Sequence, residues 1–273
     1  MPPADGRQRP GSTRPPCKQE LMGRIVLCAG LKSSGSTWLY NAVIQLCESG
    51  YRHSGENHDR RRVLPFYADR IEDFPCEAEA ADLLVIKTHI PSQPLLFLTA
   101  FTRGTILITV REPRDSIVSL MRRFGHRFDA CLEEVGRSAA HLAPLSTASR
   151  TVIFRYEEGF FRRAATIACL GKQIGIALPP AVVERIYDSL TAENVKRKIA
   201  ALKRRGVFGK GAHPDKFDAR THWHPGHIGD GRVGKYAEIL SPEMQRQVLR
   251  ATSEYCLRFG YPGDLRGRSG RRR

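Results

Sequence analysis

The stretch RIVLCAGLKSSGSTWLYNAVIQLCE, residues 24–48, decides the fold of this chain. Its first six residues form a short apolar run with β-branched side chains, a pattern that indicates a buried strand. Glycines and serines follow from Gly30 to Ser36, and apolar residues then recur at helical spacing from Trp38 to Leu46. A strand, a glycine-serine turn and a helix in this order predict the first unit of an α/β domain.

The turn between this strand and helix has the spacing of a nucleotide-phosphate loop but lacks one of its residues. Ser36 and Thr37 follow the G-x-x-x-x-G spacing where a kinase-type loop has a lysine and a hydroxyl residue, and Lys32 lies inside the turn instead. Backbone N–H groups at a helix start attract an anion, and Lys32 adds a positive charge. The stretch alone leaves three interpretations open: a degenerate ATP site, a loop for another phosphate ligand, or an ordinary turn in which Ser36 caps the helix.

Further along the chain, apolar runs alternate with helical patterns. Strands are predicted at 83–88, 105–111 and 151–156, and helices near 115–124, 127–143, 158–175, 180–204 and 241–259. Near-continuous apolar strands separated by helices predict an α/β fold of three layers, with a central parallel sheet flanked by helices and a P-loop NTPase-like core. Residues 205–232 show little periodicity and predict a long functional loop.

Composition places the chain among folded proteins with anionic partners. Of its 273 residues, 41% are hydrophobic, which is enough for a packed core. We expect one domain over residues 23–262, preceded by a disordered basic leader at 1–22 and followed by a disordered basic tail at 263–273. The 44 lysines and arginines outnumber the 28 acidic residues, so the net charge of +16 favours a nucleotide, a nucleic acid, an acidic polymer or a membrane surface as partner.

Targeting and cysteine signals indicate a cytoplasmic protein. The first residues lack the apolar core of a signal peptide, and no apolar run approaches the roughly 20 residues that span a bilayer. The seven cysteines contain no C-x-x-C pair, and several stand in apolar runs, where a cysteine acts as a small hydrophobe. Reduced thiols are therefore expected.

Two further stretches place reactive side chains at predicted strand ends. In VIKTHIP, Lys87 and His89 alternate with a threonine and can face the same side. A histidine can remove a proton from a hydroxyl, and a neighbouring lysine can stabilise the charge on a leaving oxygen. In VREPRDSIVS, Arg111 and Ser119 suit a phosphate. Each stretch by itself is also consistent with local ion pairs or a helix cap.

The long loop carries or borders four histidines, at 213, 222, 224 and 227, which raises the question of a metal site. The His-x3-His spacing of a helical metal site is absent, and no carboxylate or cysteine completes an obvious ligand set. We therefore expect no metal, and favour a lid whose backbone and basic side chains close on a phosphate.

Together and in this order, these stretches resemble the motifs of the PAPS-dependent sulfotransferase family, where PAPS is 3′-phosphoadenosine 5′-phosphosulfate. LKSSGSTWL looks like the family's P-K-S-G-T-T-W loop, IKTHIP is similar to K-T-H-L-P, and VREPRDSIVS is similar to V-x-R-N-P-x-D-x-x-x-S. FRYEE resembles R-Y-E-D-L, and the lid aligns without gaps on R-K-G-x-x-G-D-W-K/R from His224. SPEMQRQV (241–248) and the ending YCLRFGYP look like the last helix of the family, so the resemblance covers about residues 24–262.

The resemblance implies a role for each matching position. It implies that the 5′-phosphosulfate is held by Lys32, Ser33, Ser34, Gly35, Ser36 and Thr37. It implies that the 3′-phosphate is held by Arg111, Ser119 and the lid residues His224, Pro225 and Gly226. It places the adenine against Trp38, Tyr156 and Thr191. It also implies that His89 is the general base and that Lys87 and Lys32 stabilise the transferring group.

Two departures from the family pattern concern the 3′-phosphate. Glu112 stands where the family has asparagine, so its negative charge needs compensation, for which Arg114 is the candidate. The Arg-Lys-Gly of the lid is replaced by His224, Pro225 and Gly226, which removes two cations. The candidates for supplying that charge are His227, Arg220 and Arg232.

The resemblance implies in-line transfer of a sulfuryl group from PAPS to an acceptor hydroxyl, with 3′,5′-ADP as product and no metal. The basic surface favours a polar or acidic small molecule or a glycan as acceptor. Three alternatives stay open: a P-loop kinase or NTPase, a nucleic-acid or polyanion-binding protein, and a non-catalytic nucleotide binder of the same fold. No motif for reading specific nucleic-acid sequences is present.

Overall fold

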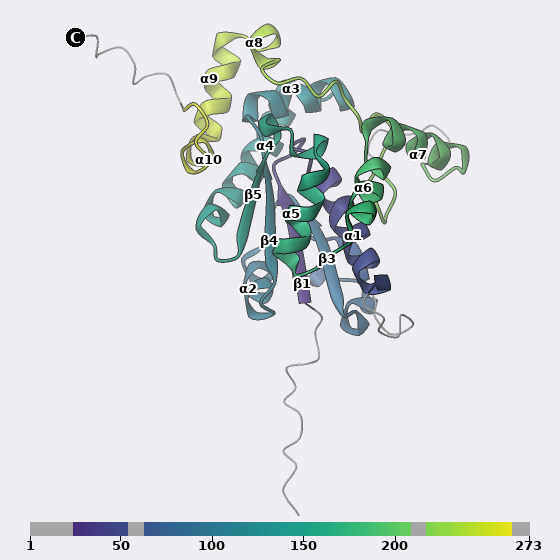
Figure 1. Ribbon diagram of the computed structural model, residues 1–273. Helices are drawn as coiled ribbons and strands as arrows, with labels where there is room; N and C mark the ends of the chain where they lie inside the picture. Colours follow the sequence, from purple (N-terminus) through teal and green to yellow (C-terminus); the bar gives the residue numbers. More distant parts are fainter. Residues whose placement is uncertain (1–23, 54–62, 209–216, 264–273) are drawn as a thin grey trace, which may run out of the picture.

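The computed structural model describes residues 24–53, 63–208 and 217–263 (Figure 1). The leader predicted at 1–22 lies outside the described residues, as does all of the predicted tail except its first residue, Gly263.

Five parallel strands form the central sheet, in the order β2-β3-β1-β4-β5. Their bounds are β1 (Arg24–Gly30), β2 (Val63–Tyr67), β3 (Leu83–Thr88), β4 (Thr105–Val110) and β5 (Thr151–Arg155). β1 lies at the centre, where Leu27 stands beside Ile86 of β3 and Ile106 of β4. The four strands expected from the sequence are confirmed, and β2 is an additional one. Its proline, Pro65, obscures the strand pattern, but an edge strand tolerates a missing N–H.

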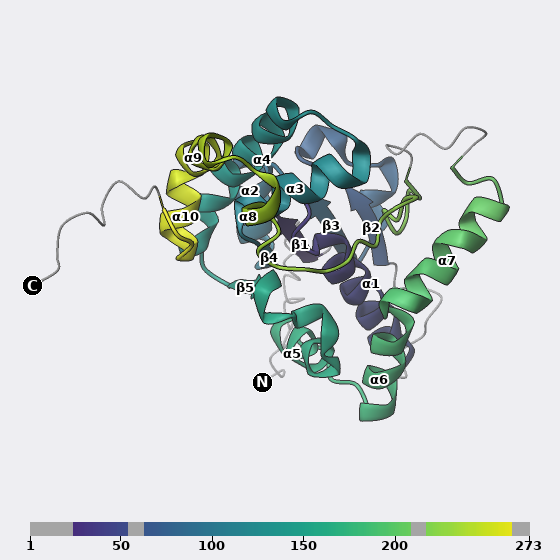
Figure 2. The same cartoon turned by 90° about the horizontal axis from the view of Figure 1, so that it is seen from above.

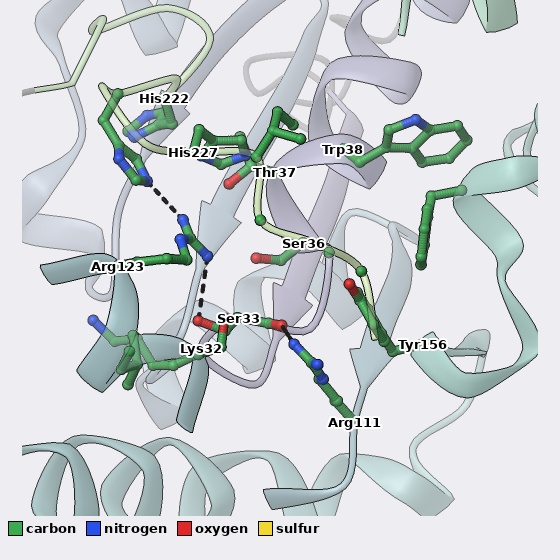
Figure 3. Close-up of a pocket in the computed structure, with 18 of the residues that line it drawn as sticks. Lys32, Ser33, Ser36, Thr37, Trp38, Arg111, Arg123, Tyr156, His222 and His227 are labelled. Atoms are coloured by element: carbon green, nitrogen blue, oxygen red, sulfur yellow. Dashed lines mark hydrogen bonds between the residues drawn. The ribbon is translucent and has the colours of Figure 1, made fainter. Parts of the chain in front are cut away.

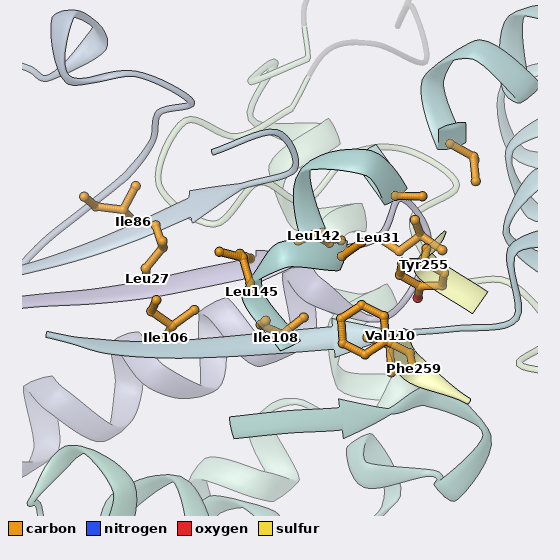
Figure 4. Packing of buried hydrophobic residues seen from close by; sticks show 14 of the residues in the cluster. Leu27, Leu31, Ile86, Ile106, Ile108, Val110, Leu142, Leu145, Tyr255 and Phe259 are labelled. Atoms are coloured by element: carbon orange, nitrogen blue, oxygen red, sulfur yellow. The ribbon is translucent and has the colours of Figure 1, made fainter. Parts of the chain in front are cut away.

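Alternating residues of the strands supply two separate cores, one on each face of the sheet. Leu27, Ile86 and Ile108 pack into the first core, whereas their neighbours Val26, Val85 and Leu107 pack into the second. Figure 4 shows the first core, in which the strand side chains meet Leu142, Tyr255 and Phe259. Burial on both faces explains why the strands read as continuous apolar runs in the sequence.

Helices cover both faces of the sheet, so the predicted three-layer α/β fold is confirmed (Figure 2). One face carries α2 (Gln93–Phe101), α3 (Pro113–Phe124), α4 (Phe128–Leu142), α9 (Pro242–Ala251) and α10 (Ser253–Phe259). The other carries α1 (Ser36–His53), α5 (Ala164–Ile174), α6 (Pro180–Ser189) and α7 (Ala192–Arg204). A single short turn, α8 (Tyr236–Ile239), precedes α9. In the described part of the chain no helix combines the length and apolarity needed to cross a membrane.

Three of the predicted helices are shorter or divided. The one expected at 158–175 begins only at Ala164, because Gly159 adopts a left-handed φ of 65° between two 3₁₀ turns. The one expected at 180–204 is divided at Thr191, whose side chain caps α7 by accepting from the N–H of Asn194 at 3.5 Å. The one expected at 241–259 is divided at Thr252 into α9 and α10. Helical periodicity continues across these breaks, so it does not reveal them.

All five strands run in the same direction, so their carboxyl ends meet at one edge of the sheet. Ligands of such sheets bind in the crevice beyond this edge. The loops after β1, β2, β3 and β4 therefore gather around a single place.

Candidate active site

A cavity of about 680 Å³ opens beyond the carboxyl ends of the strands (Figure 3). Its walls come from the loop after β1, the ends of β2 and β3, helix α3, the segment after β5, the junction of α6 and α7, and the loop 217–235. Six cations line it, namely Lys32, Lys87, Arg111, Arg123, Arg162 and Lys235, against two carboxylates, Glu134 and Asp230. The excess of positive charge suits an anionic ligand.

The loop after β1 has the backbone shape of an anion-binding turn. Ser33 and Gly35 have positive φ values of 61° and 87°, and α1 begins directly after them at Ser36. Gly30 is required because a Cβ there would lie 2.2 Å from the Thr109 hydroxyl oxygen. Such a turn directs backbone N–H groups toward one point at the helix start.

Most of the predicted phosphosulfate residues line the cavity, but Ser34 does not. The residues on the wall are Lys32, Ser33, Gly35, Ser36 and Thr37. The Ser34 hydroxyl is fully buried, donates to the carbonyl oxygen of Leu31 at 2.6 Å, and pairs with the hydroxyl of Thr109 at 2.6 Å. The side chain of Ser34 therefore fastens the loop to β4 and is not available to a ligand. Sequence spacing could not show which serine turns inward.

At the end of β3, His89 is held in one tautomer with its Nε2 toward Lys87. Its Nδ1 lies 2.6 Å from the carbonyl oxygen of Gly30, which can only accept, so Nδ1 carries the proton. Nε2 then keeps its lone pair and lies 3.2 Å from Nζ of Lys87. Burial, together with the charge of Lys87, holds the pKa of His89 well below its usual value. The imidazole is therefore neutral at pH 7 and able to accept a proton.

Lys87 is a buried lysine whose pKa is lowered. Burial and the nearby charge of Lys32 lower the pKa of Lys87 to about 7. Lys32 is half-buried and forms an ion pair with Glu134 of α4 at 3.4 Å. The two lysines predicted to stabilise the transferring group therefore stand in different states, one paired with a carboxylate and one hydrogen-bonded to a histidine.

Asp69, which the sequence did not single out, ties the end of β2 to the end of β3. One carboxylate oxygen accepts from the Thr88 hydroxyl at 2.5 Å and from the N–H groups of His89 and Ile90 at 3.3 Å each. The other accepts from the Tyr67 hydroxyl at 2.8 Å. Asp69 thus positions the backbone of His89. The sequence carried no signal for it, since β2 itself was not predicted.

Arg111 and Ser119 both line the cavity, as expected from their spacing across the start of α3. The Arg111 guanidinium donates to the carbonyl oxygens of Ser33 at 3.0 Å and Arg232 at 3.1 Å, and stacks 4.0 Å above the ring of Tyr156. Its Nε is buried without a hydrogen-bond partner among the described residues. A buried, unpartnered donor next to a phosphate loop is a place for a ligand oxygen.

The expected compensation of Glu112 is confirmed. Arg114 donates through Nε at 2.8 Å and through a terminal nitrogen at 3.0 Å to the two oxygens of Glu112, and both side chains are buried. The carboxylate is therefore neutralised by its neighbour and does not face the cavity.

Arg123, Arg162 and Lys235 also line the cavity but were not predicted. Arg123 stands four residues after Ser119 on α3, so the two share one face of the helix. That spacing is a signal that could have revealed it. Arg162 ends a short 3₁₀ turn and Lys235 directly precedes α8, so neither follows a regular sequence pattern. Only the tertiary structure brings them to the site.

Apart from Lys235, the loop 217–235 lines the cavity with histidines. Of the three candidates for the missing charge only His227 is on the wall, and burial together with the charge of Arg123 holds its pKa well below the usual value. His222, His224 and His227 line the wall, whereas Pro225 and Gly226 do not. Arg220 forms an ion pair with Glu48, and Arg232 with Glu238 at 2.5 Å, so both guanidinium groups point elsewhere. The fourth histidine of the sequence cluster, at 213, lies outside the described residues. Within the described ranges, no three His, Cys, Asp or Glu side chains converge as a metal site requires.

The residues predicted to bind adenine, Trp38, Tyr156 and Thr191, also line the cavity. Trp38 and Tyr156 lie across it from His222 and Arg123 (Figure 3). Trp38 donates to the carbonyl oxygen of Leu190 at 3.1 Å and meets Phe160 edge-on at 5.7 Å. Tyr156 packs against Phe161 at 4.7 Å, and Thr191 completes this wall. Flat aromatic surfaces with a polar rim suit a nucleobase.

Solved structures with the same fold are sulfotransferases and a retinol dehydratase. Mouse sulfotransferase SULT7A1 complexed with PAP matches with a TM-score of 0.58 and 13% identity, over 88% of this chain and 87% of that chain. Retinol dehydratase in complex with androsterone and inactive cofactor PAP matches with a TM-score of 0.56 and 17% identity, over 93% of this chain and 86% of that chain. At such identities these likenesses show the fold alone.

Sequence comparisons give the family. No curated protein matches the sequence in a direct search. The family model described as the sulfotransferase domain matches residues 24–249, well over half of the chain. That range contains the loop after β1, Lys87 and His89 at the end of β3, and the loop 217–235. The chain therefore belongs to the sulfotransferase family.

Proposed function

We propose that this sulfotransferase moves a sulfuryl group from PAPS to the hydroxyl of an acceptor, with His89 as the general base and 3′,5′-ADP as the product. The observation that carries the proposal is the neutral, fixed tautomer of His89, whose unprotonated Nε2 accepts from Lys87 in a cationic cavity next to a phosphate loop. A base needs an available lone pair within reach of the proton that it removes.

His89 accepts the acceptor's proton on Nε2. The Nδ1–H bond to Gly30 keeps the ring oriented, and it also stabilises the imidazolium that forms when Nε2 gains a proton. As the acceptor oxygen approaches Nε2, Lys87 Nζ turns from His89 toward the donor. The acceptor O–H bond breaks, the new oxygen–sulfur bond forms, and the bond from sulfur to the leaving phosphate oxygen breaks in line with it.

Lys87 and Lys32 stabilise the negative charge that grows on the leaving oxygen. Cations held in a site of low dielectric act most strongly where charge develops. Lys32 leaves Glu134 and contacts the donor instead. Breaking their ion pair of 3.4 Å costs little free energy, because both side chains are partly exposed to solvent.

The described residues fit the nucleotide donor. Ser33, Gly35, Ser36 and Thr37 surround its 5′ end, and Trp38, Tyr156 and Thr191 offer the surfaces for its adenine. Arg111 lines the cavity, and its buried Nε lacks a partner in the described structure, which supports its assignment to the 3′-phosphate. The structural neighbours named above carry PAP, which supports the same donor here.

The acceptor is proposed to be a small polar or acidic alcohol. The wall near His89 combines the aromatic rings of Tyr67 and Phe217 with the imidazole of His222. Nε2 of His222 is buried without a partner in the described structure, so it can form a hydrogen bond with a second hydroxyl group of the acceptor molecule.

The expected location is the cytoplasm. The six described cysteines are all free thiols, four of them buried, which fits a reducing compartment.

The experiment is sulfate transfer from labelled PAPS to a panel of sugars, phenols, steroids and lipids, with the wild type and a His89→Ala variant. We expect transfer by the wild type and a loss of roughly 10²- to 10⁴-fold in turnover for the variant, because the general base is gone. PAP affinity of the variant should stay within a few-fold of the wild type. Turnover near that of the wild type would show that His89 is not the base.

A thermal-shift titration separates the other interpretations. PAP should raise the melting temperature more than ATP or an oligonucleotide at the same ionic strength, because ligand binding to the native state stabilises it. Mg²⁺-dependent ATP turnover would identify a kinase or NTPase. PAP binding without transfer to any acceptor in the panel would indicate a non-catalytic binder.

A further inference from the structure

Arg123 reaches into the cavity from α3 and connects two loops that are far apart in the sequence (Figure 3). One terminal nitrogen lies 3.4 Å from the Ser33 hydroxyl and the other donates to Nε2 of His224 at 2.9 Å. A guanidinium can only donate, so His224 accepts through Nε2 and carries its proton on Nδ1, which lies 2.8 Å from the carbonyl oxygen of Pro225. Both partners of Arg123 are therefore neutral.

Arg123 also differs from three of the other five cations of the cavity, Lys32, Lys235 and Arg111, in having no carboxylate within 4.0 Å among the described residues. Lys32 pairs with Glu134 at 3.4 Å and Lys235 with Asp230 at 2.8 Å, whereas no described carboxylate lies within 4.0 Å of the Arg123 guanidinium. Its Nε is buried and lacks a hydrogen-bond partner among the described residues. Burial and the charge of Arg111 lower the pKa of Arg123 to about 10, so it stays a cation at pH 7.

Arg123 is a half-buried cation with no carboxylate partner and with one buried, unused donor, and such an arrangement is costly unless an anion completes it. The planar fork of arginine matches an oxyanion with two parallel hydrogen bonds, which are stronger than bonds to neutral acceptors such as a serine hydroxyl or a neutral histidine. An arriving oxyanion would therefore replace Ser33 and His224 as the partner of Arg123.

We propose that Arg123 is an oxyanion-binding residue that holds the donor nucleotide between the loop 30–37 and the loop 217–235. The proposal rests on the function proposed above. It also explains how the lid can lack cations at His224, Pro225 and Gly226, because the cation comes from α3 instead.

The donor, and not the acceptor, is the expected source of the oxyanion. Arg111 and Arg123 contact the same residue, Ser33, one at its carbonyl oxygen and the other at its hydroxyl. Two guanidinium groups on either side of one loop residue favour a ligand with more than one anionic group. The bisphosphate PAP has that property, and an acceptor with a single carboxylate does not.

The test is the affinity for PAP of the full chain with Arg123→Gln, measured by isothermal titration. The substitution keeps a polar side chain but removes the charge and the fork, so we expect the dissociation constant to rise on the order of 10- to 100-fold. Arg123→Lys should lose less, because it keeps the charge but not the fork. The matched control is Arg122→Gln at the preceding position of α3, whose half-exposed side chain lies outside the cavity lining. The control should bind PAP within about twofold of the wild type, as surface changes have small effects.

The outcomes separate the inference from the proposed function. If the wild type fails to bind PAP, the proposed function fails. If the wild type binds and Arg123→Gln binds equally well, the inference about Arg123 is overturned while the function stands. An unchanged affinity for PAP combined with weaker use of an acidic acceptor also overturns it, since the anion would then belong to the acceptor. The melting temperature without ligand checks folding, and a purely structural role would lower it without reducing the further rise that saturating PAP produces.

Discussion

Lys87 is a cavity residue whose protonation state affects how strongly the site attracts an anion. Its ammonium group is buried at the carboxyl end of β3, hydrogen-bonded to a histidine and close to Lys32. Burial disfavours the charged form of a lysine, and a second cation nearby disfavours it further. With the pKa of Lys87 at about 7, roughly half of the molecules carry the charge at neutral pH.

The affinity for PAP should therefore fall as the pH rises from 7 to 9. Below pH 7 Lys87 is already a cation, whereas above it binding must first add a proton, so the dissociation constant should rise up to about tenfold per pH unit. Titration calorimetry at several pH values measures this slope. In Lys87→Met the affinity should be weaker but the slope between pH 7 and 9 should disappear. A wild-type affinity that is constant over this range would contradict the assigned pKa of Lys87.

Individual residues also show where sequence reasoning stopped. Lys87, His89 and Arg111 were predicted from their places at strand ends and Ser119 from its place on the following helix, and the structure brings all four to one cavity. Ser34 was predicted with them but faces Thr109, because a turn of small residues does not reveal the direction of each side chain.

Helix α3 is the element that brings Ser119 and Arg123 to one wall of the cavity. It contributes Ser119 and Arg123 from one face, and its start is closed by the pair between Glu112 and Arg114. Arg114 also lies 3.9 Å above the ring of Tyr236, which belongs to the short turn α8. The beginning of α3 thus connects the end of β4 with the segment that follows the lid.

Removing Arg114 should destabilise the fold strongly. Arg114→Met leaves the buried carboxylate of Glu112 without its partner, and breaking a buried pair in this way lowers the free energy of unfolding by about 3–5 kcal/mol. Urea unfolding followed by circular dichroism measures the loss. The double variant with Glu112→Gln should recover part of it, because no buried charge is then left unpaired. A loss of less than about 1 kcal/mol in the single variant would show that the pair is solvated and contributes little.

At the scale of the whole molecule, the last helix, which packs on the same face of the sheet as α3 and α4, stabilises the end of β4 where Arg111 lies. Tyr255 of α10 is buried, and its hydroxyl accepts from the Arg111 N–H at 3.0 Å and donates to the Arg111 carbonyl at 3.1 Å. Tyr261 donates to Glu157 at 2.9 Å, and Glu157 accepts from the N–H of Glu112 at 2.8 Å. The match to the sulfotransferase domain ends at residue 249, before these contacts.

A chain that ends after Ala251 should therefore fail to fold stably. It lacks Tyr255 and Phe259, and removing one buried aromatic side chain alone costs roughly 3–5 kcal/mol. A chain that ends after Gly263 keeps every described contact and should bind PAP as the full chain does. Thermal unfolding and PAP titration compare the two. Cooperative unfolding of the shorter chain at the temperature of the full one would contradict the role given to α10.

The sequence by itself determined the layer architecture, four of the five strands and the nature of the loop after β1. These features depend on contiguous residues, since periodicity reports burial and the glycine-serine turn reports backbone shape. The motifs in their order also indicated the family. The edge strand β2 was missed because Pro65 interrupts its strand pattern. The helix breaks at Thr191 and Thr252 were missed because the helical periodicity continues across them.

Only the tertiary structure decided which side chains converge. Asp69 reaches the backbone of His89 across 20 positions, and Arg123 reaches His224 across 101. Such contacts depend on the order of strands and on the packing of helices against the sheet, which place distant segments side by side. The physical reason is that a parallel sheet collects the ends of all its strands at one edge, whereas the sequence lists them one after another. The cation that contacts the lid, Arg123, therefore comes from α3, which lies next to the lid only in the folded protein.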